Sequence, residues 1–177
     1  MERPVADRIF NVLFICGGNS ARSILAEALL NRHGEGRFKA FSAGSDHEGA
    51  VDPEAIKLLD HLGFETSGLR SKSWDEFAAP DSPVMDFIFT VCDDAAGETC
   101  PVWPGHPVTA HWGIEDPSPV IGPEREHAFF QALHYLENRI SLFVNLPFDK
   151  LDSITLKTHV AEIGQTAGAS VPRSQVA

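Results

Sequence analysis

Residues 9–30 read IFNVLFICGGNSARSILAEALL, and an apolar run, a glycine-containing loop and a periodic segment follow one another within them. The run 9–15 is rich in β-branched and aromatic residues, which is typical of a buried strand. Residues 24–30 carry apolar side chains at helical spacing, and Gly34 follows them as a helix stop. The pattern therefore predicts a strand, a loop and a helix.

The same alternation of strand and helix continues along the chain. A helix begins most clearly after Asp52, a preferred N-cap residue, with Pro53 at the first helical position and Gly63 past the end. Because short buried strands alternate with helices, we expect a three-layer α/β domain with a four-stranded parallel sheet and right-handed crossovers. The strands are expected over residues 9–15, 38–43, 85–91 and 108–112, and the helices over 24–30, 52–62, 73–77, 123–146 and 148–163.

Length and composition are those of one globular domain. The 177 residues, 43% hydrophobic and 22% charged, predict a single domain over residues 1–164 and a loose polar tail over 165–177. The formal net charge of −11 disfavours nucleic acid and anionic lipid as partners. We find no secretory signal and no run long enough for a membrane span, so we expect a cytoplasmic protein whose three cysteines are thiols.

The loop after the first predicted strand has the residue types of an oxyanion site. Cys16 and Arg22 stand in the spacing C-x5-R before a helix, where glycine and Asn backbones can turn successive N–H groups inward. Arg22 can grip two oxyanion oxygens, and the positive surroundings favour the thiolate form of Cys16, to which Ser23 can hydrogen-bond. A buried strand-end cysteine before an ordinary helix is the alternative. The candidate oxyanion-binding residues are Gly17, Gly18, Asn19, Ser20, Ala21, Arg22 and Ser23.

A second cysteine is expected near this loop. Ligands of parallel α/β sheets bind at the carboxyl ends of the strands; Cys16 follows the first predicted strand and Cys92 ends the third. In the flavodoxin-like strand order these two strands are neighbours, about 4.8 Å apart, which brings their ends within reach of a disulfide. Cys16 and Cys92 are therefore a candidate pair of cysteines for a disulfide.

Three motifs, in order along the chain, resemble those of the arsenate reductases built on the low-molecular-weight protein tyrosine phosphatase scaffold. They are FICGGNSARSILAEALL from Phe14, VCDDAAGETCPVWPG from Val91 and HWGIEDPS from His111, and the resemblance runs from about Asn11 to Leu146. The resemblance implies a flavodoxin-like fold with a four-stranded parallel sheet. It also implies reduction of arsenate to arsenite through three cysteines.

Carried over by position, the resemblance gives five residues a catalytic role. Cys16 resembles the attacking thiolate and Arg22 the oxyanion clamp. Asp116, in the Asp-Pro motif, resembles the general acid. Cys92 resembles the first resolving thiol and Cys100 the second. The disulfide would then move from Cys16–Cys92 to Cys92–Cys100, where an external dithiol protein can reach it.

The resemblance also implies what the protein binds. The substrate is arsenate, with phosphate or sulfate as mimics; no cofactor is bound, and external thioredoxin, or glutaredoxin with glutathione, recycles the disulfide. Some relatives hold a monovalent cation beside the anion loop; Asn19, Glu27 and Ser42 match its ligands, but Lys72 stands in the fourth place. We expect the Lys72 ammonium to replace that ion, and therefore neither potassium dependence nor a bound metal.

Three alternatives use the same residues differently. A protein tyrosine phosphatase of this scaffold needs no second cysteine, but it places aromatic residues after the Asp-Pro motif, where Ser118 and Pro119 stand here. A thiol redox or oxyanion sensor would undergo one stoichiometric oxidation and no steady turnover. A zinc site is disfavoured because Cys92 and Cys100 are too far apart in the sequence for a zinc knuckle.

Overall fold

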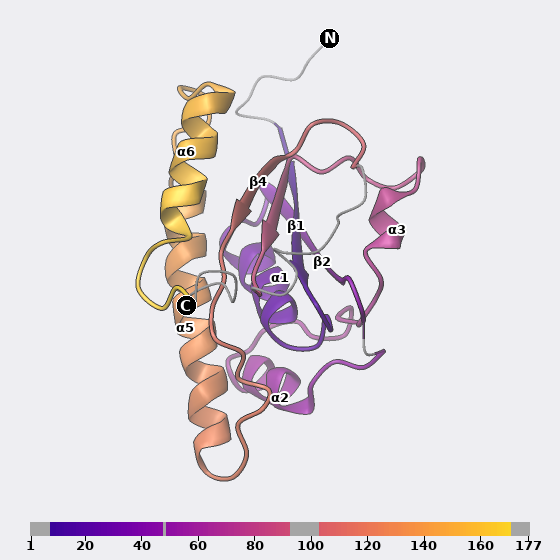
Figure 1. Cartoon of the computed structure of the whole chain (residues 1–177), viewed down its shortest axis with the longest axis vertical. Coiled ribbons are helices and arrows are strands. Elements are labelled where there is room, and N and C mark those ends of the chain that lie inside the picture. The colour runs from indigo at the N-terminus through magenta and orange to yellow at the C-terminus, as the bar shows by residue number, and fades with distance from the viewer. Residues whose placement is uncertain (1–7, 48, 93–102, 171–177) are drawn as a thin grey trace, which may run out of the picture.

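The computed structural model describes residues 8–47, 49–92 and 103–170, and a parallel sheet lies at its centre (Figure 1). The strand order is β2-β1-β3-β4, and neighbouring strands are parallel throughout. The prediction of a four-stranded parallel sheet is confirmed, and β1 and β3 are neighbours as expected. The strands are β1 (Phe10–Cys16), β2 (Phe38–Gly44), β3 (Phe87–Thr90) and β4 (Val108–His111).

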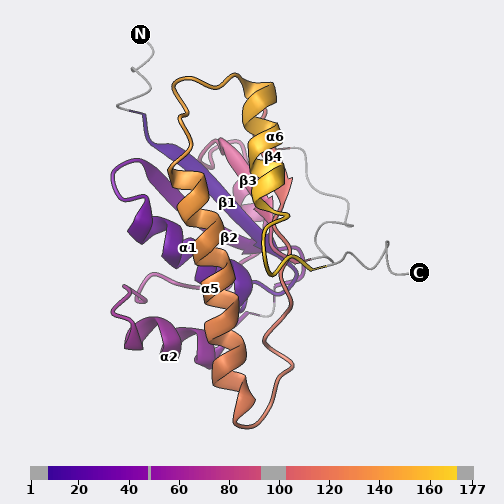
Figure 2. The same ribbon diagram turned by 90° about the vertical axis from the view of Figure 1, so that its left-hand side faces the viewer.

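Helices cover both faces of the sheet (Figures 1 and 2). On one face, α1 (Arg22–His33) and α5 (Glu124–Val144) pack side by side, with α2 (Pro53–His61) against them and α6 (Ser153–Ile163) beside β4. The short helix α3 (Asp75–Ala78) lies across the sheet from α5 and α6. The three-layer α/β architecture is therefore confirmed. Within the three described ranges, no helix is long and apolar enough to cross a membrane.

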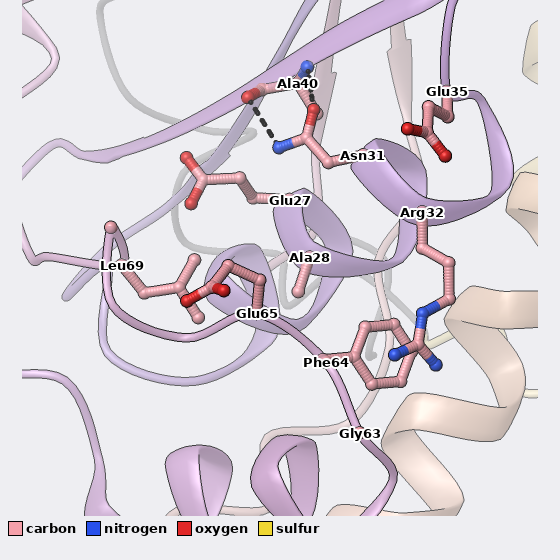
Figure 3. A pocket seen from close by; sticks show the side chains of 11 residues that line it. Glu27, Ala28, Asn31, Arg32, Glu35, Ala40, Gly63, Phe64, Glu65 and Leu69 are labelled. Atoms are coloured by element: carbon pink, nitrogen blue, oxygen red, sulfur yellow. Dashed lines mark hydrogen bonds between the residues drawn. The ribbon is translucent and has the colours of Figure 1, made fainter.

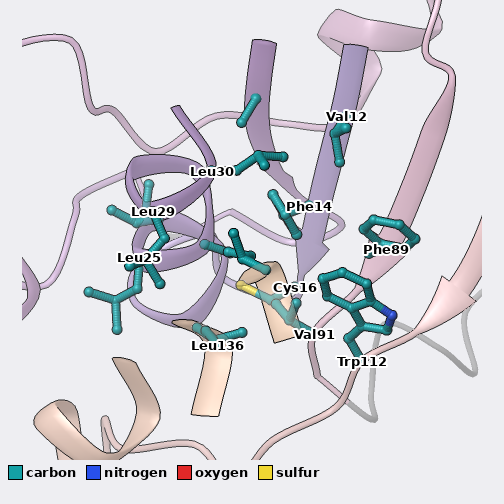
Figure 4. Close-up of a cluster of buried hydrophobic side chains, with 14 of the residues drawn as sticks. Val12, Phe14, Cys16, Leu25, Leu29, Leu30, Phe89, Val91, Trp112 and Leu136 are labelled. Carbon is teal, nitrogen blue, oxygen red and sulfur yellow. The ribbon is translucent and has the colours of Figure 1, made fainter. Parts of the chain in front are cut away.

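Aromatic side chains join the sheet to α5 in a close-packed core (Figure 4). Trp112, directly after β4, is fully buried and stacks on Phe89 with ring centroids 4.0 Å apart. The Phe143 ring of α5 meets both rings edge-on. Cys16 lies at the end of this core and is 4% exposed. Because β1 ends in a rigid environment, the loop that follows Cys16 starts from a well-defined position.

The last helix begins later than predicted. It starts at Ser153 and not at residue 148, because the Asp152 side chain caps it by accepting a hydrogen bond from the Thr155 amide at 2.7 Å. The apolar residues before the cap favour a helix by periodicity, but the cap sets the first turn. The other helices and strands differ from the prediction by a few residues at their ends, where local signals are weakest.

The segment after α6 folds back onto the loop that follows β4. Ala169 pairs with Ile114 in an antiparallel bridge. The sequence predicts a loose tail from residue 165, and the small and polar side chains of residues 165–170 carry no local pattern for this long-range pairing. Residues 171–177 lie outside the described part of the chain.

Candidate active site

The anion loop, residues 16–23, is held from outside through its carbonyl groups. A peptide unit whose carbonyl points outward presents its N–H on the opposite side, so we infer that the amides of Gly18, Asn19 and Ala21 face inward, while the Gly17 amide donates to the Cys92 sulfur. Asn19 has φ 48°, a left-handed conformation that Asn tolerates better than most residues. The bonds run from Ser45 N to Cys16 O (3.3 Å), Asp46 N to Gly17 O (2.9 Å), Ser71 Oγ to Gly18 O (3.3 Å) and Asp52 N to Ser20 O (2.9 Å).

The sulfur of Cys16 belongs to a buried chain of hydrogen bonds. Its Sγ lies 2.9 Å from Ser23 Oγ, and Ser23 Oγ accepts a hydrogen bond from Asn19 Nδ2 at 2.8 Å. The Lys72 amide donates to Asn19 Oδ1 at 2.9 Å, which orients the Asn19 side chain with its NH2 group toward Ser23. Because Ser23 Oγ already accepts from Asn19, its own hydrogen can point at the Cys16 sulfur and stabilise a thiolate there.

Arg22 brings the acid loop, residues 113–120, against the anion loop. Its Nη1 donates to the Ile114 carbonyl at 2.9 Å, and its Nη2 lies 3.4 Å from Asp116 Oδ2. The other carboxylate oxygen of Asp116 accepts from the Ser118 amide at 2.9 Å. The Asp116 side chain is 40% exposed and that of Arg22 only 13%. One largely buried guanidinium thus joins the start of α1 to the proposed acid.

Cys92, just after β3, lies against the anion loop. Its Sγ accepts a hydrogen bond from the Gly17 amide at 3.1 Å, and the residue is 2% exposed. The candidate pair of cysteines therefore occupies one buried edge of the sheet, as the strand order predicts. Cys100 lies outside the described residues. The structure brings together Cys16, Arg22, Asp116 and Cys92, and their catalytic roles stay predictions.

A buried ion pair lies behind the anion loop. Lys72 Nζ is 3.9 Å from Glu27 Oε1 and donates to the Arg70 carbonyl at 2.9 Å, while Ser42 Oγ donates to Glu27 Oε1 at 3.4 Å. Burial raises the pKa of Glu27 and lowers the pKa of Lys72. Because an ammonium group already neutralises Glu27, these residues do not fit a monovalent cation at this position. Within the described residues, no group of three or more His, Cys, Asp or Glu could hold a metal ion.

The cavity in Figure 3 is separate from the anion loop. It has a volume of about 520 Å³ beside α1, and Glu27 forms part of its wall. Arg32 rests on the Phe64 ring at its rim, with Cζ 3.4 Å from the ring centroid. Its described lining includes neither Cys16 nor Arg22. The candidate oxyanion-binding loop is therefore not part of this cavity.

Three residues that support the site escape prediction from the sequence. A Cβ on Gly44, the last residue of β2, would lie 2.6 Å from the Gly17 carbonyl oxygen, so the anion loop packs against this glycine. A glycine at the carboxyl end of a strand is the signal for such a close approach. Asp52, predicted only as an N-cap, also forms an ion pair with Arg125 of α5, whose Nη2 donates to both carboxylate oxygens. No local pattern marks Arg125.

The fold and the site together define a class of protein. A buried cysteine ends a central parallel strand, and it is followed by a loop of inward amides and by an arginine at the start of a helix. This arrangement is typical of α/β proteins that bind an oxyanion beside a reactive thiol. Residues 11–153 match the family described as low molecular weight phosphotyrosine protein phosphatase, and the chain belongs to that family.

Several similar proteins carry a more specific name. The arsenate reductase of Bacillus subtilis is 34% identical over 134 residues, which are 75% of this chain and 93% of the relative. The crystal structure of arsenate reductase from Archaeoglobus fulgidus matches with a TM-score of 0.60 and 32% identity, over 76% of this chain and 99% of that chain. A thioredoxin-dependent arsenate reductase of Corynebacterium glutamicum matches with a TM-score of 0.58 and 25% identity, over 77% of this chain and 60% of that chain. The resemblance to arsenate reductases on this scaffold is confirmed.

Proposed function

We propose that this protein reduces arsenate to arsenite, with Cys16 as the nucleophile and Cys92 and Cys100 as a disulfide relay. One observation carries the proposal: the Cys92 sulfur accepts a hydrogen bond from Gly17, inside the anion loop, at 3.1 Å. Phosphate-ester hydrolysis does not require a second thiol at the anion loop, whereas a reductase needs one to form the first disulfide. Relatives and solved structures named arsenate reductase support the same conclusion.

In the first step the Cys16 thiolate attacks the arsenic atom of bound arsenate. An As–S bond forms and an As–O bond breaks, and the departing oxygen takes a proton from Asp116 and leaves as water. Arg22 and the loop amides neutralise the negative charge on the remaining oxygens. Ser23, 2.9 Å from the sulfur, stabilises the thiolate before the attack.

The second step is the redox step. The Cys92 thiolate attacks the Cys16 sulfur, and a disulfide forms as the As–S bond breaks. The electron pair of that bond passes to arsenic, so As(V) becomes As(III) and arsenite leaves. Each cysteine sulfur is oxidised by one electron, which balances the two electrons that arsenic gains. Cys100 then attacks Cys92 and releases Cys16 as a thiolate.

Regeneration needs an external dithiol protein. The proposed reductant is thioredoxin, with glutaredoxin and glutathione as the alternative, because the Cys92–Cys100 disulfide must be reduced in every cycle and no bound cofactor takes part. The similar Corynebacterium glutamicum protein is described as thioredoxin-dependent, which supports this choice. A relay of thiols works in a reducing compartment, so we place the protein in the cytoplasm.

The proposal is tested by arsenate-dependent NADPH oxidation coupled through thioredoxin and its reductase. The wild type should turn over steadily, and Cys92→Ser should lose this activity while keeping slow hydrolysis of a small aryl phosphate, which needs only Cys16, Arg22 and Asp116. Serine can still accept the Gly17 hydrogen bond, so the loop is preserved. Arsenate reduction by Cys92→Ser at the wild-type rate would refute the relay. A single stoichiometric oxidation of the wild type would indicate a sensor.

A further inference from the structure

Arg125, in the first turn of α5, contacts both the acid loop and a residue that supports the anion loop. Its Nη1 donates to the carbonyl groups of Ser118 at 2.6 Å and Val120 at 2.9 Å. Its Nη2 donates to both carboxylate oxygens of Asp52, at 2.8 Å and 2.6 Å. The side chains are 27% exposed for Arg125 and 12% for Asp52, so water and salt screen this pair less than a surface ion pair.

Asp52 continues the connection to the anion loop. Its amide donates to the Ser20 carbonyl at 2.9 Å, while its side chain also caps α2. At the other end, the Asp116 carboxylate accepts from the amide of Ser118, the residue whose carbonyl Arg125 holds. A series of hydrogen bonds therefore joins the anion loop to the proposed acid.

The stability of α5 does not explain why an arginine occupies position 125. A cation in the first turn faces the positive end of the helix dipole, where acidic residues such as Glu124 and Glu126 are favourable. A lysine could not replace it, because a single ammonium group cannot span a carboxylate and two carbonyls as the planar fork does. The Phe129 ring, 4.9 Å from the guanidinium carbon, supports it from one side. The contacts of Arg125, and not its helix, account for its position.

We propose that Arg125 and Asp52 are positioning residues for the general acid, an inference that rests on the proposed function. Neither residue touches the reacting atoms. They hold the acid loop at the distance from the anion loop at which Asp116 reaches the departing oxygen. Since misplacing a reacting group by about 1 Å can cost about 100-fold in rate, loosening this link lowers kcat more than it raises KM.

A double-mutant cycle in the full chain tests this role. Arg125→Met should lower kcat for arsenate reduction by about 10-fold to 100-fold, and Arg125→Lys should do nearly the same. In an Asp116→Asn background, Arg125→Met should have little further effect, because no acid remains to be positioned. The matched control Arg70→Lys, which alters an exposed bidentate pair with Glu76, should leave kcat unchanged.

Two further measurements separate positioning from general damage. Alkylation of Cys16 by iodoacetamide, and its protection by inorganic phosphate, report the anion loop and should not change in Arg125→Met. Asp52→Asn, which keeps an N-cap residue on α2, should reproduce part of the fall in kcat. An equal fall of kcat in both Asp116 backgrounds, or a loss of phosphate protection, would overturn the positioning role.

Failure of the proposed function and failure of the positioning role give different results. If the wild type does not reduce arsenate, the proposed function is wrong. The double-mutant cycle is then measured with hydrolysis of an aryl phosphate that has a poor leaving group. That reaction requires the same acid. A fall with Arg125→Met that disappears in the Asp116→Asn background then supports the positioning role alone, and the absence of such a fall refutes it.

Discussion

The Gly17 amide donates a hydrogen bond to the Cys92 sulfur over 3.1 Å, so the residue next to Cys16 in the chain holds the second cysteine in place. Cys16 and Cys92 end up in one buried environment although they are far apart in the sequence. A backbone N–H aimed at a sulfur stabilises negative charge on it, which suits a thiol that must attack as a thiolate. The proposed relay therefore begins from a preorganised contact between the anion loop and Cys92.

Ser23→Ala should slow the reaction of Cys16 with iodoacetamide at neutral pH. The substitution removes the hydroxyl that lies 2.9 Å from the sulfur, and a hydrogen bond to a charged group contributes about 1.5 kcal/mol, so the rate should fall by about tenfold. The measurement is the rate of carboxamidomethylation by mass spectrometry. Ser141→Ala, on the exposed side of α5, is the control. Equal alkylation rates for Ser23→Ala and wild type would show that Ser23 does not contribute to the reactivity of Cys16.

Gly44→Ala should weaken oxyanion binding. A Cβ at this position would lie 2.6 Å from the Gly17 carbonyl oxygen and 3.0 Å from the Asn19 Cβ, and backbone atoms cannot yield as a flexible side chain can. Overpacking of this kind costs about 1–3 kcal/mol, so phosphate should protect Cys16 from alkylation about tenfold less well. In the control Gly68→Ala, a Cβ meets nothing within 4 Å. Unchanged protection in Gly44→Ala would mean that the loop does not depend on this contact.

Local patterns predict the parts of the site that lie next to one another in the sequence. The anion loop follows from an apolar strand, glycines and a helical period within residues 9–30, and the position of Cys92 follows from the rule that parallel strands share one binding edge. The contact of Gly17 with Cys92 spans 75 residues, yet it could be predicted because both residues lie at strand ends.

Other contacts cannot be predicted from the positions of strand ends. Arg125 and Asp52 are 73 residues apart, one in the first turn of a helix and the other at a helix N-cap, and neither position indicates the other. The pairing of Ala169 with Ile114 likewise depends on how α6 packs and not on the residues themselves. Side-chain contacts between loops are decided by tertiary packing, which composition and periodicity do not encode.

Lys72→Met should destabilise the fold, and the loss should grow as the pH rises. Burial raises the pKa of Glu27 and the Lys72 ammonium partly lowers it, so the pKa of Glu27 rises further in the variant. A carboxyl whose folded pKa exceeds the unfolded value of 4.5 contributes stability that is complete below that pH and is lost as the pH rises through the folded pKa. Above that range the variant carries an uncompensated buried charge, which costs about 3–5 kcal/mol.

Urea unfolding at about pH 5 and about pH 8 measures this dependence. The difference in unfolding free energy between wild type and Lys72→Met should be larger at the higher pH. Lys57→Met, at an exposed position of α2, should show no such trend. A loss of unfolding free energy in Lys72→Met that is equal at the two pH values, or larger at the lower pH, would contradict this explanation of the Glu27–Lys72 pair.

Potassium should not stabilise this protein. The Lys72 ammonium lies 3.9 Å from Glu27 Oε1 and supplies the positive charge that a bound cation would bring to this carboxylate. The melting temperature in potassium chloride should equal that in choline chloride at the same ionic strength, because an ion that does not bind the folded state cannot shift its stability by mass action. A rise in melting temperature that is specific to potassium and saturates with concentration would show a cation site after all.

The most direct test of the relay uses Cys100→Ser, in which the first disulfide cannot be passed on. One addition of arsenate to the reduced variant, without thioredoxin, should yield one equivalent of arsenite and a disulfide between Cys16 and Cys92, identified by peptide mapping under non-reducing conditions. Arsenite formed while both cysteines remain open to alkylation, or no arsenite at all, would contradict the account.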